Sequence, residues 1–272
     1  MKKLLSISVF LAYLLVLVAC EKVIEIDLTD SKEVIVIEAS ITNIKSPVRV
    51  LVSKTSPFLG AKTANPVSGA KVSIRTEKGK PNYFVEAMPG EYVYPNNSVE
   101  PGQWYICEVE YNGITYTARS FMNDKVPIGD VKFTHFDGLG FFDSGYKVVC
   151  FIKDPEKTVN YYRFRYIVNG EPVDDRGDLT IFSDKLFNGK VVGLNHGSFV
   201  FQKTDTLVVE IRSIDKAAYD YYSTLRSISG FETFQSASLA NPLSNFNNGA
   251  LGYFSAYTYE RRKMIIQDYL TE

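Results

Sequence analysis

The side chains that most often perform chemistry in proteins are scarce in this 272-residue chain. It has two histidines, His135 and His196, and no His-x-x-x-His pair or cysteine pair at zinc-binding spacing. His196 lies two residues before Ser198, but no Gly-x-Ser-x-Gly turn is present to expose a serine nucleophile. We therefore predict a polar turn at 195–198, no metal site, no cofactor and no enzymatic activity.

A second group of candidate residues is acidic. Asp174, Asp175 and Asp178 surround Gly177 and could offer carboxylates to calcium. An EF-hand loop needs further ligands at fixed offsets and a bidentate Glu at its end, and these are missing. The sequence also has no phosphate-binding Gly-x-x-x-x-Gly-Lys motif and no dinucleotide fingerprint. A solvated turn is the expectation here, with calcium binding as the alternative.

The first twenty residues have the organisation of an export signal. Lys2 and Lys3 precede an uncharged run from Leu4 to Val18, which is shorter than the roughly 18 to 20 apolar residues of a membrane-spanning helix. The following tetrad, Leu17-Val18-Ala19-Cys20, resembles the lipobox of bacterial lipoproteins. This resemblance implies a signal peptide at 1–19 and a mature chain attached to a membrane by lipid on Cys20. The alternative is an ordinary signal peptide that happens to end in cysteine.

Composition excludes one class of partner and favours one class of fold. Thirty Lys and Arg residues against 31 Asp and Glu residues leave no basic excess for a phosphate backbone, so nucleic acid is not an expected partner. Aromatic residues make up 14% of the chain, as is typical of β-rich proteins. Cys107 and Cys150 lie in strand-like alternations in two different predicted domains. Two buried free thiols are therefore favoured over a disulfide between them.

Alternating apolar residues predict the first strands. Residues 34–41 place Ile35, Ile37, Ala39 and Ile41 on one strand face. Asn112-Gly113 predicts a two-residue type I′ hairpin, because both residues tolerate positive φ. This turn fixes a register that pairs Tyr111 with Ile114, Val109 with Tyr116, Cys107 with Ala118 and Glu108 with Thr117. It also predicts a core face that includes Ile114, and a second contact or a bulge at Trp104, Ile106 and Phe121.

The predicted fold is mainly β, with two β-sandwich-like domains after a lipidated tether at 20–33. The polar stretch before Pro127 separates an N-terminal domain at 34–124 from a β-rich domain at 127–272. The second domain contains expected strands at 146–152, 161–168 and 206–212, strand-like alternation from Tyr253 to the end, and one helix near 215–228 with Asp215 as its N-cap. Core packing is expected of the aromatic residues in 161–166, with ring display to a ligand as the alternative. The long segment 229–250 is expected to be functional or to pack as a cover.

Several motifs in this order resemble the Bacteroidota lipoproteins grouped as domain of unknown function 4249. They are Cys20-Glu21-Lys22, the stretch 66–74, Tyr111-Asn112-Gly113 with Tyr116-Thr117-Ala118, Val126-Pro127-Ile128, the stretch 213–219, and the tail from Asn241-Pro242 to Phe254. The resemblance implies two-domain β-rich envelope proteins, often encoded beside TonB-dependent receptors. It supplies no catalytic residues. The first domain is also similar to transthyretin-like and regulatory β-sandwiches through the strand entry at Pro66 and the stretch Pro89-Gly90-Glu91-Tyr92.

These observations lead to one main hypothesis of function. We expect a non-enzymatic outer-membrane lipoprotein that is a partner or ligand-capturing subunit of a TonB-dependent transporter. The alternatives are a structural or assembly lipoprotein without a ligand of its own and, third, an unrecognised hydrolase. Neither the ligand nor the membrane face, periplasmic or cell-surface, follows from the sequence.

The predicted contact surface consists of aromatic residues on two loops of the second domain. Phe141 and Phe142 lie in a turn-rich loop at 137–145, and Phe231 and Phe234 lie in the long segment 229–250. Loops on a rigid β scaffold commonly carry binding residues. Core packing of some of these rings is the alternative.

Overall fold

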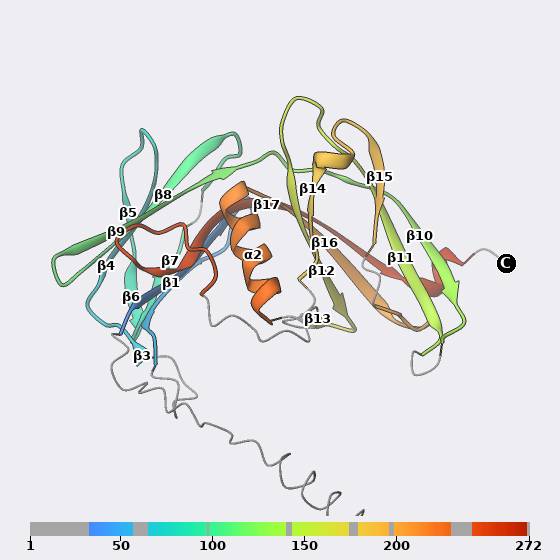
Figure 1. Cartoon of the computed structure of the whole chain (residues 1–272), viewed down its shortest axis with the longest axis horizontal. Helices are drawn as coiled ribbons and strands as arrows, with labels where there is room; N and C mark the ends of the chain where they lie inside the picture. Colours follow the sequence, from blue (N-terminus) through green and yellow to red (C-terminus); the bar gives the residue numbers. More distant parts are fainter. Residues whose placement is uncertain are drawn as a thin grey trace, which may run out of the picture. The chain divides into compact units, whose positions relative to one another are not determined.

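A ten-stranded sheet runs through most of the described chain (Figure 1). The computed structural model describes residues 33–56, 65–96, 98–139, 143–173, 179–195, 199–229 and 241–270. The order of strands in this sheet is β13 (Glu171–Val173), β12 (Tyr161–Val168), β16 (Thr206–Ile214), β17 (Leu251–Ile265), β1 (Ile35–Thr42), β2 (Val48–Lys54), β7 (Glu91–Tyr94) and β6 (Val85–Met88). In addition, β14 (Ile181–Ser183) pairs with β12 and β3 (Asn65–Pro66) pairs with β2.

Two smaller sheets complete the β structure. A four-stranded sheet has the order β5 (Asn82–Tyr83), β4 (Lys71–Thr76), β8 (Gln103–Tyr111) and β9 (Ile114–Met122). A three-stranded sheet has the order β10 (Ile128–Phe136), β11 (Gly145–Lys153) and β15 (Val191–Leu194). The helical elements of the described residues are η2 (Asp184–Leu186), α2 (Lys216–Ser229) and η3 (Ile266–Tyr269). No helix in this part of the chain is both long and apolar enough to cross a bilayer.

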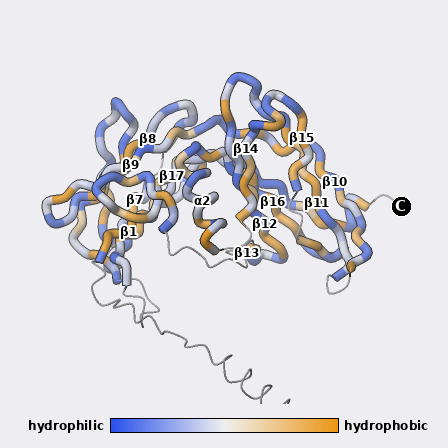
Figure 2. The backbone as a smooth tube through the Cα atoms, viewed as in Figure 1, coloured by the Kyte–Doolittle hydropathy of each residue, from blue (hydrophilic) through white to orange (hydrophobic). Residues whose placement is uncertain are grey.

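Two separate cores hold these sheets together. The first core combines buried residues of β1, β2 and β7 with those of β4, β8 and β9. The second combines β10, β11 and β15 with β12, β16 and the end of β17. Figure 2 shows the hydrophobic stretches on strands of both halves and hydrophilic stretches at many of the turns. The prediction of a mainly β fold with two sandwich-like parts is confirmed.

Each of the two cores contains one cysteine. Cys107 lies in the first core and Cys150 in the second, and both are free and buried. Burial raises the pKa of both thiols, that of Cys150 to about 12. The prediction of two buried free thiols is therefore confirmed.

The predicted boundary near residues 124–127 does not interrupt the ten-stranded sheet. Strand β17 pairs in parallel with β1 and antiparallel with β16, so it joins the two sandwich halves (Figure 1). Phe246, Ala250 and Phe254 are buried in the first core, although they belong to the predicted second domain. The end of β17 is buried in the second core. Local alternation predicts a strand here but does not specify which strands it pairs with. Its partner β1 lies more than 200 residues earlier in the chain.

The hairpin between β8 and β9 forms as predicted. Asn112 and Gly113 have φ values of 50° and 75°, as a type I′ turn requires, and all four predicted cross-strand pairs are present. The prediction that Ile114 is in the core is wrong, because its side chain is 46% exposed. Pairing of β4 with β8 ends at Glu110, so the hairpin tip extends beyond the neighbouring strand.

The residues that did not fit the outward face of this hairpin form a contact of their own. Trp104 and Phe121 are paired across the two strands, with ring centroids 5.4 Å apart in an edge arrangement. The Arg119 guanidinium lies 3.9 Å from the centre of the Trp104 ring. The register of β8 and β9 is continuous at these residues, so the bulge is excluded, and Trp104 and Phe121 form an aromatic and cationic cluster with Arg119 on this face of the hairpin.

The helix α2 begins after Asp215, as predicted. The Asp215 carboxylate accepts a hydrogen bond from the Ala218 amide at 2.9 Å, which is the N-cap interaction. Its other oxygen accepts from the Phe121 amide of β9 at 3.2 Å, so the cap also joins the helix to the first half. The helix packs against Tyr161 and Tyr257 of the ten-stranded sheet. Of the aromatic residues in 161–166, Tyr162, Phe164 and Tyr166 lie in the second core, which confirms core packing.

A buried carboxylate, that of Glu210, binds two arginines on the face of the ten-stranded sheet against which α2 packs. Glu210 is 1% exposed and accepts hydrogen bonds of 2.6 Å from both Arg212 and Arg261. Burial alone would raise its pKa, but the two guanidinium groups outweigh burial and hold the pKa of Glu210 below its ordinary value. The carboxylate is therefore ionised in the folded protein.

The segment 66–70, one of the motifs noted above, is held by a single buried tyrosine. The Tyr92 hydroxyl donates to the Val67 carbonyl at 2.8 Å and accepts from the Ala70 amide at 2.9 Å. Tyr92 is 1% exposed, so these two bonds satisfy polar groups that water does not reach. The motif is thus a structural feature of the first core.

The asparagine-rich segment at 245–248 covers the free edge of β9. Asn247 accepts from the Thr117 amide through its side chain at 2.7 Å and donates to the Thr117 carbonyl through its backbone at 3.0 Å. Asn248 donates to the Thr115 carbonyl at 2.8 Å. An edge strand with unpaired backbone groups is prone to association, and this segment satisfies those groups. The described part of the long segment therefore packs as a cover.

Candidate functional site

The predicted site residues lie outside the described part of the chain. This applies to Cys20, Phe141, Phe142, Phe231 and Phe234, which remain predictions. It applies equally to the acidic turn at 174–178 and to the turn that contains His196 and Ser198.

The one described histidine is a surface residue. His135 Nδ1 lies 3.0 Å from a carboxylate oxygen of Asp137, and both side chains are more than half exposed. Its ring contacts Tyr146 edge-on, with centroids 5.2 Å apart. Among the described residues, no group of three or more His, Cys, Asp or Glu side chains could hold a metal ion.

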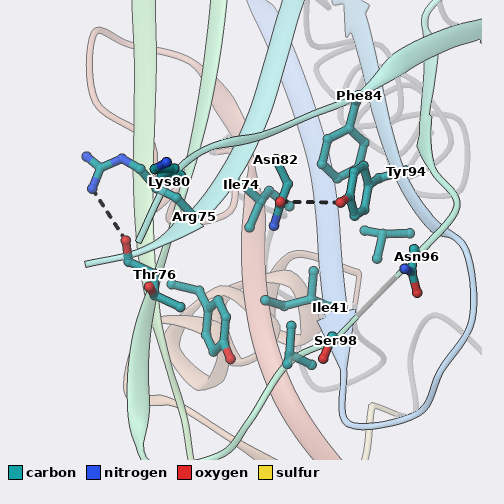
Figure 3. A pocket seen from close by; sticks show the side chains of 13 residues that line it. Ile41, Ile74, Arg75, Thr76, Lys80, Asn82, Phe84, Tyr94, Asn96 and Ser98 are labelled. Atoms are coloured by element: carbon teal, nitrogen blue, oxygen red, sulfur yellow. Dashed lines mark hydrogen bonds between the residues drawn. The ribbon is translucent and has the colours of Figure 1, made fainter. Parts of the chain in front are cut away.

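A cavity at one end of the first sandwich is the best candidate for a binding site (Figure 3). It has a volume of about 210 Å³ and opens between the ten-stranded sheet and the four-stranded sheet. Its lining comes from β1, β2, β4, β5, β7 and β8 and from the loops between them. The lining residues are Ile41, Val48, Ile74, Arg75, Thr76, Lys80, Asn82, Phe84, Tyr94, Asn96, Ser98, Val99 and Tyr105. We refer to it as the sandwich-end pocket.

The deep part of the sandwich-end pocket is apolar. Ile41, Val48, Ile74 and Tyr105 are at most 5% exposed and also belong to the first core. The Tyr105 hydroxyl donates to the Glu100 carbonyl at 2.9 Å and accepts from the Glu100 amide at 2.7 Å. These two bonds fix the loop that carries Ser98 and Val99, because they join it to β8.

Two aromatic rings and several polar groups form the mouth of the pocket. Figure 3 shows Phe84 and Tyr94 on one side of the space and Arg75 and Lys80 on the other. The two rings have centroids 5.6 Å apart, and the Tyr94 hydroxyl donates to the Asn82 side-chain oxygen at 3.3 Å. This bond orients the amide group of Asn82 and leaves its two N–H donors for another partner.

The two cations at the mouth are in different situations. Arg75 donates to the Glu108 carboxylate at 3.2 Å and to the Glu77 carbonyl at 3.3 Å, so its charge is compensated. Lys80 is exposed and has no ion pair with any described residue. Lys80 is consequently the cation that a ligand in the pocket could use.

The described lining of the pocket has apolar and hydrogen-bonding groups that suit ligand binding, but not the groups that usually act in acid–base or nucleophilic catalysis. Its described lining contains no carboxylate, imidazole or thiol, so no general base adjoins the hydroxyls of Thr76 and Ser98. An apolar interior with a few convergent hydrogen-bonding groups is typical of small-molecule sites. The arrangement can hold a ligand that combines an apolar surface with hydroxyl, amide or anionic groups.

Three of the other cavities are larger and more open, and two of them are much larger. One of about 430 Å³ lies over β1, β2 and β7 and is lined by Glu38, Arg49, Glu91 and Tyr253 among others. Its Arg49 and Glu91 already form an ion pair of 3.3 Å. Another of about 680 Å³ lies beside the linker at Asn123 and Asp124. The sandwich-end pocket is preferred because it is more enclosed and its floor consists of residues of the first core.

Sequence reasoning did not find the sandwich-end pocket. Its residues come from six strands, and each floor residue reads as ordinary core in the strand alternation. One signal was present, since polar residues gather in two segments: Lys80 and Asn82 lie just before and at the start of β5, and Asn96 and Ser98 lie in the connection between β7 and β8. Polar residues on connections are common, however, and only the paired sheets bring these segments together.

Comparison with known proteins adds little about function. No curated protein matches the chain. Among solved structures, a segment of two fibronectin type III domains from chicken tenascin is 12% identical, with a TM-score of 0.22, over 67% of this chain and 91% of that chain. The chicken interferon gamma receptor alpha chain is 9% identical, with a TM-score of 0.20, over 67% of this chain and 89% of that chain. Scores this low carry no argument. The model of the family described as "Domain of unknown function (DUF4249)" matches residues 21–263, so the chain belongs to this family.

Proposed function

We propose that this protein is a non-enzymatic binding module of the cell envelope, held on the outer membrane by lipid on Cys20. In this proposal it captures a small ligand in the sandwich-end pocket and works as a partner or ligand-capturing subunit of a TonB-dependent transporter. The observation that carries the binding role is the pocket itself. Apolar floor residues, two aromatic rings and hydrogen-bonding groups converge there around a space of about 210 Å³.

The membrane part of the proposal rests on the sequence. The lipobox-like tetrad before Cys20 supplies an anchor that needs no membrane-spanning helix. The transporter part rests on the family resemblance, because relatives of this kind are often encoded beside TonB-dependent receptors. A lipid-anchored protein beside such a receptor could raise the local concentration of a ligand at the receptor mouth.

Ligand binding is tested by thermal unfolding of the chain from residue 21, in the presence of saccharides, amino acids and dipeptides. A ligand that binds only the folded state raises Tm, and stability increases by RT ln(1 + [L]/Kd). Ser98→Trp should abolish the Tm increase by filling the mouth of the pocket. The matched control Thr134→Trp places the same ring on an exposed position of β10 and should keep it.

The outcomes separate the candidate functions. A Tm increase that Ser98→Trp removes and Thr134→Trp keeps supports capture in the pocket. A Tm increase that survives Ser98→Trp places the ligand elsewhere and rejects this pocket. The transporter role is tested by isolating the lipidated protein under mild detergent. A co-purifying TonB-dependent receptor supports that role, whereas its absence favours the structural or assembly lipoprotein.

A further inference from the structure

Two loops at one end of the second half are joined by buried carboxylates. These are residues 153–160, between β11 and β12, and residues 184–191, from η2 to the start of β15. Asp154 accepts from the Tyr162 hydroxyl at 2.5 Å and from the Gly189 amide at 3.0 Å. Asp184 accepts from the Asn160 amide at 2.7 Å. Figure 1 shows both loops at the same end of this half.

The two carboxylates make this end a defined surface. Asp154 and Asp184 are each 2% exposed, and the Asp154 amide also donates to the Lys190 carbonyl at 3.0 Å. Burial and the Asp154 carboxylate raise the pKa of Tyr162, so its hydroxyl stays protonated and keeps donating. The backbone positions from which the exposed side chains project are therefore fixed relative to one another.

Large aliphatic side chains project from these loops into solvent. Leu186 is 91% exposed, Val191 is 67% exposed and Val159 is 63% exposed. Scattered exposed aliphatic residues are normal on a soluble surface. Three of them lie on two loops that are joined by the backbone bond from the Asp184 amide to the Asn160 carbonyl and by the pair Lys153–Val191, and exposed apolar residues gathered in this way mark contact surfaces.

Both loops also carry lysines close in sequence to these aliphatic residues. Lys153, Lys157, Lys185 and Lys190 are exposed, and none forms an ion pair with a described residue. Glu156 is the one exposed carboxylate in the two loops, because Asp154 and Asp184 are buried and hydrogen-bonded. The exposed carboxylate of Asp124 adjoins the same loops, so four lysines lie beside two exposed carboxylates, and the surface is locally cationic although the whole chain has a net charge of −1. We call residues 153–160 and 184–191 the lysine tip.

We propose that the lysine tip docks on an anionic lipid surface, with Leu186, Val159 and Val191 entering the headgroup region and the four lysines facing lipid phosphates. Exposed aliphatic side chains flanked by lysines match the two layers of such a surface, since methylene groups favour the acyl boundary and lysines favour the anionic headgroups. The contact goes beyond the proposed function, because it uses neither Cys20 nor the sandwich-end pocket. It would orient the second half relative to the membrane.

The test is vesicle co-sedimentation of the chain from residue 21, which carries no lipid and keeps every described element, since these begin after residue 32. The vesicles contain equal parts of phosphatidylglycerol and phosphatidylcholine, or phosphatidylcholine alone. We expect binding to the anionic vesicles that weakens in 0.5 M salt. Lys185→Gln with Lys190→Gln should weaken it by roughly tenfold or more.

Matched variants separate the lysine tip from general charge and hydrophobicity. Lys45→Gln with Lys78→Gln removes the same charge from exposed positions of the first half and should leave binding unchanged. Leu186→Ser with Val191→Ser should reduce binding, whereas Val85→Ser with Met88→Ser, at exposed positions of β6, should not. Absence of binding to anionic vesicles by the folded chain overturns the proposal. Equal losses in the tip and control variants overturn it as well, because binding would then be non-specific.

Discussion

Gly252 is the position where one added methyl group should do the most damage. It lies on β17 opposite Ile37 of the parallel neighbour β1, with a φ of +93°. A Cβ at this position would lie 2.0 Å from the Ile37 carbonyl oxygen and 2.8 Å from the carbonyl carbon. Both atoms are backbone and cannot rotate away. Gly252→Ala therefore forces β1 and β17 apart at the strand pair that joins the two sandwich halves.

The neighbouring Gly249 supplies a matched control. Its φ is +75°, but a Cβ there would have no heavy atom within 4 Å. Gly249→Ala should therefore cost only the strain of positive φ, about 1 kcal/mol. Gly252→Ala carries that strain and, in addition, the loss of ladder hydrogen bonds at about 1 kcal/mol each, so we expect a total of about 3 to 5 kcal/mol.

The measurement is urea unfolding followed by circular dichroism, with the free energy of unfolding compared among the wild type and the two variants. The difference between Gly252→Ala and Gly249→Ala isolates the steric part, because both replace a glycine of positive φ by alanine. A difference below about 1 kcal/mol would refute the close approach of β17 to β1.

Three further predictions concern buried groups. Glu210→Gln should destabilise the fold at neutral pH by about 3 kcal/mol, because two arginines lose their carboxylate. The pKa of Glu210 is lower in the folded state than in the unfolded state. The carboxylate therefore stabilises the fold above its unfolded pKa, and this stabilisation is lost as the pH falls through its folded pKa. In urea unfolding at successively lower pH, the free energies of unfolding of the wild type and Glu210→Gln should converge. Tyr92→Phe should cost about 1 to 3 kcal/mol in the same assay by leaving two buried backbone groups unsatisfied, whereas Tyr94→Phe, at the pocket mouth, should cost less. In a Cys20→Ser chain, a thiol reagent should label Cys107 and Cys150 only after unfolding, and rapid labelling of the native protein would contradict their burial.

Local signals in the sequence were sufficient for several of the strands, for the hairpin between β8 and β9 and for the helix. Asn112-Gly113 fixes its turn through backbone conformation alone, and the register of β8 and β9 follows from that turn. Asp215 predicts the start of α2 because a carboxylate at that position satisfies a free backbone amide. In each case the cause lies within a few residues of its effect.

Long-range pairing was beyond the reach of the same reasoning. The alternation from Tyr253 predicts a strand. The sequence does not show whether this strand pairs in parallel with β1 or with another strand of the second half. The close packing at Gly252 was likewise hidden, since a glycine within a strand indicates a bulge or a close approach without naming the partner. The sandwich-end pocket depends on the same long-range pairs, because they bring its six strands together.

Part of the segment 229–250 has a structural role that accounts for it. The described part of the segment 229–250 packs on β9 and on α2, where the Leu243 amide donates to the Thr224 hydroxyl at 3.0 Å. Residues 241–250 therefore have a structural role. The contact hypothesis for this segment depends on Phe231 and Phe234, which lie outside the described residues.

Phe231→Ser with Phe234→Ser distinguishes contact from packing. If the two rings form a contact surface, the variant should keep the wild-type Tm and lose receptor co-purification, because polar side chains replace apolar ones only at the interface. If they are core residues, Tm should fall steeply, since removal of a buried phenylalanine side chain costs about 3 to 5 kcal/mol. Asn247→Ala, which removes the side-chain acceptor for the Thr117 amide, is the control for the packed part of the segment. It should lower Tm while receptor co-purification from the folded protein persists, and loss of co-purification in this control alone would move the contact surface to residues 241–250.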